Sequence, residues 1–296
     1  MSEPVAVVVV TWNSAHEIEA CLRSVRVEAP VELWVVDNGS ADGTRERVRD
    51  HFPEAQLLES PVNVGFAAGC NLGVAHSSAP YVLFLNADAQ LAPGYLRTLV
   101  AALTRDPAAA SATGKLVYDE DGVQRIDSAG IVIHRHALRP MDRGYGEVDN
   151  GQFDTAENIF GPSGAAALYR RSALLAAGEG PFDAELFAYY EDVDLAWRLN
   201  RLGWRHLYEP NAVAFHKRRG ADNKPTDIAA RAFANRYVVW LKNESWREFL
   251  RYGWIAIPWE LARLVRRAAT RPRLLRGVGA AVGRAPGILR SRWRQE

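Results

Sequence analysis

A run of five apolar residues at 81–85, Tyr-Val-Leu-Phe-Leu, is the feature that most constrains the fold of this chain. A strand without polar alternation is buried on both faces, and such strands occur in parallel sheets that helices cover on either side. The run ends at Asn86, and Asp88 follows two residues later. Because ligands of open α/β proteins bind at the carboxyl edge of the sheet, both side chains lie where a site is expected.

Asn86 and Asp88 are compatible with two interpretations. Their oxygen atoms suit a hard divalent ion, Mg²⁺ or Mn²⁺, and the neighbouring Ala87 and Ala89 leave the approach to Asp88 open. The same residues also make an ordinary polar turn after a core strand. Residues 81–89 alone leave both interpretations open.

The beginning of the chain repeats the pattern of buried strands that end in polar residues. Residues 5–11 form a continuous β-branched run, and residues 31–36 form a second run that ends in Asp37. Apolar residues recur at helical spacing between them, and a strand–helix–strand unit of this kind requires a parallel sheet. Ser14 and Glu17 have the spacing of a capping box at the start of the intervening helix.

Asp37 also has two interpretations. An acid at a strand end can cap the helix that follows. It can also accept a hydrogen bond from the imide N–H of uracil or thymine, or from a ribose hydroxyl. Its position at the same sheet edge as Asp88 favours the second interpretation.

The chain lacks two common phosphate-binding signatures, although a glycine precedes one of its predicted helices. Gly65 precedes a helix of small residues, which can approach both a ligand and the sheet closely. There is no Gly-Lys-Ser/Thr sequence, and the first strand leads into Thr11-Trp12-Asn13 without a glycine cluster. Neither a Walker loop nor a dinucleotide fingerprint is therefore predicted.

Further along, the pattern predicts a helix from Pro93, a strand at 111–118 and a flexible excursion at 119–160 that covers a site. Residues 131–133 are expected to form one arm of a hairpin within this excursion. Small residues at 161–165 leave room for a bulky substrate.

Three acids, Glu191, Asp192 and Asp194, open the next predicted helix. Acids in a first turn stabilise the helix dipole, and this is the simplest interpretation. Alternatively, a carboxylate held there serves as a general base.

His216 follows a predicted strand at 212–215. A lone histidine at a strand end is usually structural or solvated. Together with Asp88, however, a neutral imidazole would make a mixed nitrogen–oxygen site for Mn²⁺ or Mg²⁺. The basic loop at 217–220 could close over a diphosphate.

The C-terminal part differs from the rest of the chain in charge. The net charge is +1, which gives no general attraction for nucleic acid, yet residues 263–294 contain ten arginines and no acid. Helices are predicted at 226–242 and 245–268, whereas glycines argue against a helix after about 275. The aromatic second helix either packs on the core or lies on an anionic membrane with its rings at headgroup depth.

No targeting or spanning segment is expected. The N-terminus lacks a basic region, and no window reaches about 18 uninterrupted apolar residues. Cys21 and Cys70 lack metal-ligand spacing and are expected to be reduced thiols. We therefore expect a cytoplasmic protein, peripheral at the inner face of the cell membrane only if the C-terminal segment binds lipid.

Six motifs, in this order and spacing, resemble the inverting glycosyltransferases of family 2, and the resemblance covers about residues 5–220. It implies an α/β protein of the GT-A fold, in which helices flank a mostly parallel central sheet, with a helical C-terminal appendage. The motifs are VVVTWN (8–13), VVDNGSADGT (35–44), NVGFAAGCN (63–71), FLNADA (84–89), GPSGA (161–165) and YEDVDL (190–195).

The resemblance assigns the nucleotide-binding residues. It implies a nucleoside pocket and a nucleotide-facing side on the same half of the sheet. The pocket residues are Thr11, Asn13 and Asp37, and the residues that line the nucleotide side are Asn63, Gly65 and Asn71.

The resemblance also assigns the metal site and the base. Asn86, Ala87 and Asp88 stand where the family has its Asp-x-Asp metal motif, with Asn in place of the first Asp, as in rhamnosyl- and galactofuranosyltransferase-like branches. Asp88 is left as the metal ligand. Asp192 matches the catalytic base, and His216 matches a histidine that completes the metal site in some members.

The implied activity is metal-dependent, inverting transfer of a sugar, with Mg²⁺ or Mn²⁺ as cofactor. The donor would be dTDP-rhamnose or a UDP-hexose, and the acceptor a saccharide or a lipid-linked molecule in cell-surface polysaccharide synthesis. The implied catalytic domain is 1–222, with a nucleotide-binding half at about 1–118 and an acceptor-binding half at about 119–222. A helical, basic segment occupies 223–296.

Two other classes of function remain open. A nucleotidyltransferase on a similar fold would require a Gly-rich loop with a basic residue directly after the first strand. Thr11-Trp12-Asn13-Ser14 contains neither a glycine nor a basic residue. A non-catalytic sugar-nucleotide binding module predicts that the acids are lost, whereas Asp88 and Asp192 are present.

Overall fold

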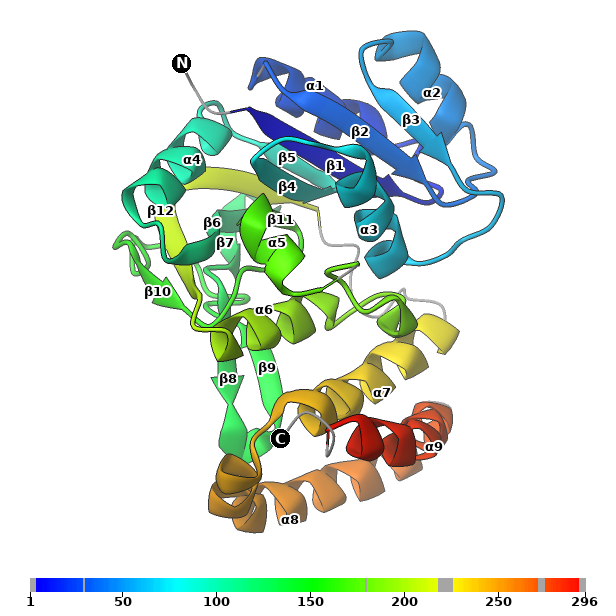
Figure 1. Ribbon diagram of the computed structural model, residues 1–296, viewed down its shortest axis with the longest axis vertical. Coiled ribbons are helices and arrows are strands. Elements are labelled where there is room, and N and C mark those ends of the chain that lie inside the picture. Colours follow the sequence, from blue (N-terminus) through cyan, green and yellow to red (C-terminus); the bar gives the residue numbers. More distant parts are fainter. Residues whose placement is uncertain (1–3, 29, 179, 218–225, 271–274, 293–296) are drawn as a thin grey trace.

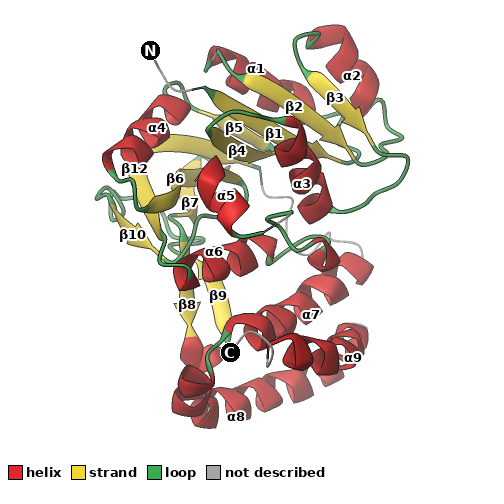
Figure 2. Ribbon diagram, viewed as in Figure 1, coloured by secondary structure: helices red, strands yellow, loops and turns green. Residues whose placement is uncertain are grey.

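The computed structural model describes residues 4–28, 30–178, 180–217, 226–270 and 275–292 (Figure 1). Strands and helices alternate at first, and three long helices end the chain (Figure 2). The helices are α1 (Ile18–Val27), α2 (Thr44–His51), α3 (Phe66–His76), α4 (Tyr95–Arg105), α5 (Arg171–Ala176), α6 (Glu191–Arg201), α7 (Thr226–Asn243), α8 (Trp246–Thr270) and α9 (Leu275–Arg292), with short 3₁₀ turns η1 (Arg135–Ala137) and η2 (Ala184–Leu186). The strands are β1 (Val5–Thr11), β2 (Glu32–Asp37), β3 (Gln56–Glu59), β4 (Tyr81–Asn86), β5 (Ala89–Leu91), β6 (Ala109–Glu120), β7 (Val123–Ser128), β8 (Ile131–His134), β9 (Arg139–Asp142), β10 (Glu157–Ile159), β11 (Ala166–Arg170) and β12 (Arg205–His216).

One large sheet forms the centre of the described chain. Its main order is β10-β12-β6-β11-β4-β1-β2-β3, with β5 added beside β12 and β7 beside β6. Strand β11 runs antiparallel to both β4 and β6, and β10 runs antiparallel to β12. The other six strands of the main order point the same way, which confirms the prediction of a mostly parallel sheet.

Strand β1 shows why the sheet needs helices on both faces. All seven of its residues are buried, and the six apolar ones alternate between two apolar clusters. Val5, Val7 and Val9 pack with residues of α1, α2 and α4. Ala6, Val8 and Val10 pack with residues of α3, α5 and α6 on the opposite face. A three-layer arrangement follows, in which β1 is shielded from solvent along its whole length.

The register of the sheet brings the polar strand ends together. Thr11 at the end of β1 pairs with Asp37 at the end of β2, and Val10 pairs with Asn86 at the end of β4. Strand β5 then runs back beside β12, so that Ala89 pairs with His216. Residues far apart in the sequence therefore share one edge, as predicted.

Two local predictions need correction. The capping box at Ser14 and Glu17 does not form: helix α1 begins at Ile18, and the Ser14 hydroxyl donates to the Trp12 carbonyl instead. The region at 119–160 contains strands β7, β8, β9 and β10 rather than a single irregular excursion. The hairpin expected around 131–133 is present as β8 paired with β9.

Two further elements differ in extent from the prediction. Helix α4 begins at Tyr95 rather than at Pro93, because Gly94 adopts a left-handed conformation just before it. The strand expected at 212–215 is longer: it begins at Arg205 as β12 and has a bulge between Glu209 and Val213.

Helix α7 packs against α6 and α9. Trp240 of α7 stacks edge-on against Trp197 of α6 with ring centroids 4.9 Å apart. Helix α9 lies so close to α7 that a Cβ on Gly277 would come within 2.1 Å of the Ala230 carbonyl oxygen. The prediction that glycines argue against a helix after about 275 is therefore wrong: Gly277 permits this close packing, and α9 also accommodates Gly279 and Gly283.

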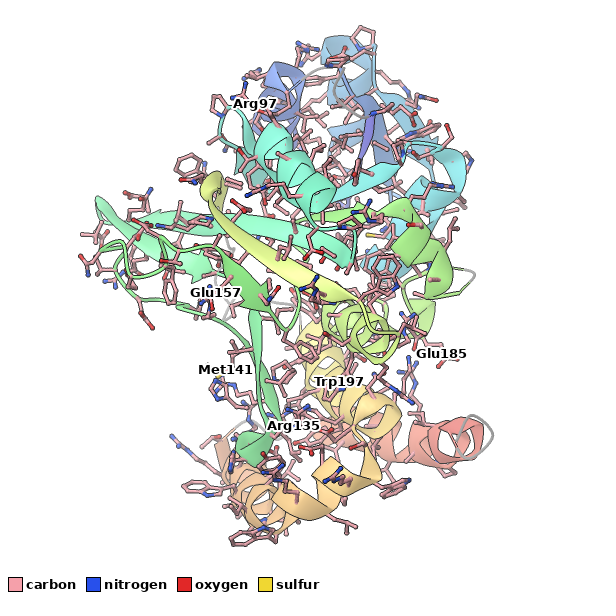
Figure 3. The ribbon with its side chains drawn as sticks, turned by 60° about the vertical axis from the view of Figure 1, so that its left-hand side comes forward. Arg97, Arg135, Met141, Glu157, Glu185 and Trp197 are labelled. Atoms are coloured by element: carbon pink, nitrogen blue, oxygen red, sulfur yellow. The ribbon has the colours of Figure 1, made fainter. Side chains whose placement is uncertain are left out.

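The β8–β9 hairpin extends from the sheet region and contacts α8 with its tip (Figure 3). Arg135, at its tip, pairs with Glu244 at 3.1 Å and with Glu248 at 3.6 Å. Among the described helices, none is long and apolar enough to cross a membrane.

Candidate active site

The edge formed by β4, β5 and β12 holds an acid–histidine pair. The His216 Nε2 atom lies 3.2 Å from Asp88 Oδ1 and 3.4 Å from the Asn86 carboxamide nitrogen. On its other side, His216 Nδ1 lies 2.8 Å from Asp127 Oδ2. Asp127 is fully buried on β7, so it holds the imidazole ring in one orientation.

This group fits a divalent cation. A metal-binding histidine is usually oriented by a carboxylate on its second nitrogen, as Asp127 does for His216. No cluster of three or more His, Cys, Asp or Glu residues suited to a metal occurs in the described chain. Two protein ligands, Asp88 and His216, would leave the other positions to phosphate oxygens and water, as is usual for Mg²⁺.

The charge on His216 reflects these neighbours. Burial opposes protonation, but hydrogen bonds to Asp127 and Asp88 outweigh it and raise the pKa of His216 to about 9. A coordinated cation would take the place of the proton on Nε2.

The small-residue loop at 161–165 links this edge to the acids of α6. The Ala165 carbonyl oxygen accepts a hydrogen bond of 2.9 Å from the Asn86 backbone N–H. The preceding Gly164 N–H donates to Asp192 Oδ2 at 2.9 Å. A Cβ on Gly164 would lie 3.2 Å from that oxygen. The consecutive loop residues Gly164 and Ala165 thus connect Asp192 of α6 with Asn86 of β4.

The three acids of the first turn of α6 have different environments. Asp194 is fully buried and ion-paired with Arg198 and Lys242, both at 2.9 Å. Glu191 is 6% exposed, and its Oε2 atom has no hydrogen-bond partner among the described residues. Asp192 is half-buried and is therefore the acid of this turn that a substrate can reach.

The ionisation of these acids follows from their environments. Burial raises the pKa of Asp192, and the hydrogen bond from Gly164 only partly offsets this. Burial and the neighbouring Asp192 also raise the pKa of Glu191. For Asp194, burial acts in the same direction, but Lys242 and Arg198 hold its pKa below the usual value. Asp192 combines accessibility with raised basicity, which suits a general base.

The opposite side of the edge has hydrogen-bonding capacity that the described protein does not use. Thr11 Oγ1 and Asp37 Oδ1 are buried, adjacent in register and without partners. The second Asp37 oxygen accepts from the Ser40 N–H at 2.9 Å. A buried polar atom without a partner costs about 1–3 kcal/mol, so this pair is suited to a ligand that supplies a donor.

The remaining predicted nucleotide residues bond to the protein itself. Asn13 Oδ1 accepts from the Ala41 N–H at 2.8 Å, and Asn63 Oδ1 accepts from the Gly65 N–H at 2.9 Å. The Asn71 carboxamide makes two bonds to the backbone of Phe182: Nδ2 donates to its carbonyl at 2.8 Å, and Oδ1 accepts from its N–H at 2.9 Å. These side chains shape the surrounding loops, and their contact with a nucleotide stays a prediction.

Two further points concern residues outside the sequence expectations. Asp127 was not among the predicted residues, because an acid in the middle of the 119–160 region carries no local signal. Of the predicted basic loop, residues 218–220 lie outside the described residues. The Lys217 N–H donates to the Asp88 carbonyl at 3.0 Å.

Comparison with known proteins gives consistent matches. The model of "Glycosyl transferase family 2" matches residues 6–176. The N-acetylglucosaminyl-diphospho-decaprenol L-rhamnosyltransferase of Mycobacterium tuberculosis is 30% identical over 277 residues, which cover 85% of this chain and 89% of that protein.

Solved structures show the same fold. A mannosyltransferase from Pyrobaculum calidifontis, in complex with GDP-Man and Mn²⁺, superposes with a TM-score of 0.58 at 21% identity, covering 98% of this chain and 83% of that one. GalNAc-T7 with UDP, GalNAc and Mn²⁺ gives a TM-score of 0.63 at 13% identity, covering 81% and 48%.

Removing the carboxylate behind His216 should weaken metal binding. We expect Asp127→Asn to reduce the affinity for Mn²⁺ about 10–100-fold, because the imidazole loses its orienting partner. Asp88→Ala should abolish the effect of Mn²⁺ on UDP or dTDP binding. Calorimetry with and without Mn²⁺ measures both, and Asp149→Asn, which disturbs the ion pair with Lys115, is the control. Unchanged Mn²⁺ binding in Asp88→Ala would place the ion elsewhere.

Proposed function

Because the chain belongs to glycosyl transferase family 2 and is a glycosyltransferase with the GT-A fold, we propose that it catalyses metal-dependent, inverting sugar transfer from a nucleoside-diphosphate donor. One observation carries the proposal: Asp192 is the accessible acid of its turn, and the loop at 164–165 ties it to the edge that holds Asn86. Family membership also favours this reading over a nucleotidyltransferase or a non-catalytic binding module.

Different residues would bind the nucleoside, hold the metal ion and accept the proton. Thr11 and Asp37 would bind the nucleoside through their unused oxygen atoms. Asp88 and His216 would hold Mg²⁺ or Mn²⁺, which neutralises charge on the diphosphate leaving group. Asp192 takes the proton from the acceptor hydroxyl while that oxygen bonds to the anomeric carbon. The bond from that carbon to the diphosphate oxygen breaks, its electron pair leaves with the nucleotide, and the configuration inverts.

The donor and acceptor follow from similarity. Asn86 in place of the first acid of the metal motif, and a relative named as an L-rhamnosyltransferase that uses a diphospho-decaprenol-linked sugar, support dTDP-rhamnose or a UDP-hexose as donor. The same relative supports a lipid-linked or saccharide acceptor in cell-surface polysaccharide synthesis. We assign 1–222 to the catalytic domain, with halves at about 1–118 and 119–222, and 223–296 to the C-terminal helical segment.

A donor screen tests the proposed reaction. Release of nucleoside diphosphate should be fastest with dTDP-rhamnose or a UDP-hexose, and it should require Mg²⁺ or Mn²⁺. The matched control is the same mixture with Asp88→Ala protein. Exclusive turnover of a GDP-sugar would contradict the proposed donor.

Replacement of the base should affect turnover rather than binding. We expect Asp192→Asn to keep donor binding and to lower kcat by roughly 10²-fold or more, because only proton transfer is lost. In the wild type, kcat should rise with pH through a pKa above the usual carboxyl range, since the half-buried Asp192, whose pKa burial raises, must be deprotonated to act. Near-normal turnover of Asp192→Asn would remove Asp192 from this role.

The outer face of α8 supports peripheral contact with an anionic membrane. Leu250, Trp254 and Val265 are 76%, 73% and 71% exposed. Arginines beside this face are exposed, whereas Glu248 and Glu260, the acids of α8, are paired with arginines. A second copy would set arginine against arginine, so lipid suits the face better. The apolar face consists of Trp246, Leu250, Trp254, Ile257, Leu261 and Val265.

Vesicle flotation tests this contact. The full chain should float with vesicles that contain anionic lipid and less well as salt rises, because each arginine near the surface contributes about 1 kcal/mol. Leu250→Glu with Trp254→Glu should abolish flotation, whereas Val27→Glu, at an exposed apolar residue of α1, should not. Equal flotation with neutral and anionic vesicles at low salt would exclude this role, and self-association through α8 would then be the alternative.

A further inference from the structure

The chain just before the proposed base adopts an unusual conformation. Phe187 has φ 65° and ψ −66°, and the Ala188 N–H donates to the Leu186 carbonyl at 2.7 Å. This is a γ-turn of the rare, strained form. Tyr189 and Tyr190 follow with φ values of 71° and 72°. Residues other than glycine rarely adopt positive φ angles. Contacts with the surrounding structure must therefore hold this turn in place.

One buried side chain of α7 supplies much of that restraint. Asn235 is 0% exposed, and its Nδ2 atom donates to the Leu186 carbonyl at 2.7 Å. The same nitrogen lies 3.1 Å from the Ala188 carbonyl and 2.9 Å from the Tyr189 carbonyl. The two hydrogens of this amide are thus shared among three carbonyls of the strained turn. An aliphatic side chain could make none of these bonds.

The other side of the turn is held by the start of α3. The Ala67 N–H donates to the Phe187 carbonyl at 3.1 Å. Gly65 has φ 90°, and a Cβ there would come within 2.5 Å of that same carbonyl oxygen. The Gly65 carbonyl in turn accepts from Asn38 Nδ2 at 3.1 Å, next to Asp37. The turn therefore bridges the proposed nucleotide side and α7.

The turn leads directly into the acids of α6. Tyr190 is the residue before the helix, and its carbonyl accepts the Asp194 N–H at 2.9 Å. The direction in which the first turn of α6 starts depends on the conformation at 187–190. Asp192, two residues beyond Tyr190, meets the Gly164 N–H only with α6 in this position.

We propose that Asn235 is a positioning residue for sugar transfer: it holds the strained turn at 186–190 and thereby sets Asp192 against the loop at 164–165. The inference rests on the proposed role of Asp192 as the base. It gives α7, which lies in the proposed C-terminal segment at 223–296, a part in positioning a catalytic residue of the proposed catalytic domain.

A double-mutant cycle tests this role. Asn235→Ala should lower kcat about 10²-fold, as expected for a misplaced catalytic group, and change the donor KM by less than about threefold. Tyr189→Gly removes a side chain that opposes the positive φ, so the loss of kcat on Asn235→Ala should be smaller in the Tyr189→Gly background. A residue that only stabilises the fold would show no such coupling.

The matched control is Asn200→Ala. Asn200 Nδ2 also donates to two backbone carbonyls, those of Phe160 at 2.7 Å and Ala196 at 2.8 Å, but at the far end of α6. Thermal unfolding of each variant reports whether the folded state is retained. If Asn235→Ala does not fold, the cycle is repeated with Asn235→Ser, which keeps a donor.

The outcomes separate the two proposals. Equal kcat losses for Asn235→Ala and Asn200→Ala, or no coupling to Tyr189→Gly, would overturn the positioning role. Failure of both Asn235 variants to fold would overturn it as well, since Asn235 would then serve the fold. Near-normal turnover of Asp192→Asn, measured in parallel, would instead refute the proposed base.

Discussion

The parallel pairing of β1 with β2 and β4 is the interaction on which the rest of the structure depends. It buries β1 completely and requires helices on both faces of the sheet. Polar side chains can then reach solvent only beyond the strand ends, and the register sets Thr11 beside Asp37. Their buried oxygen atoms have no hydrogen-bond partner among the described residues, and the large apolar core around β1 offsets the cost.

Much of the fold was predictable because its signals are local. Predominantly apolar runs identified β1, β2 and β4, and helical spacing with acids in the first turn identified α6. The errors arose where distant contacts outweigh local preference. The Ser14 N–H bonds to Thr44 Oγ1, 30 residues away, in place of a capping box. The glycine at 277 fits against α7 in a helix that composition alone argues against.

The candidate site was predictable only in part, for the same reason. Acids that follow a strand or open a helix can be recognised from their neighbours, as Asp88 and Asp192 were. Asp127 and Asn235 cannot, because their partners lie 89 and up to 49 residues away. Both act on the orientation of a neighbouring group, the His216 ring in one case and a backbone turn in the other. Residues that orient others depend on tertiary packing, which a sequence motif does not record.

The three acids at the start of α6 illustrate how packing distinguishes the proposed base, Asp192, from its neighbours in a charged motif. All three favour the helix N-terminus equally, so the dipole alone does not distinguish them. Lys242 and Asn243 of α7 bind the carboxylate of Asp194, so that this acid is not available as a base. Burial without a partner for Oε2 favours the neutral form of Glu191, which reduces repulsion against an ionised Asp192. Asp192 is left half-buried, with one oxygen fixed by Gly164, and α7 takes part in this selection through both Asp194 and the turn at 186–190.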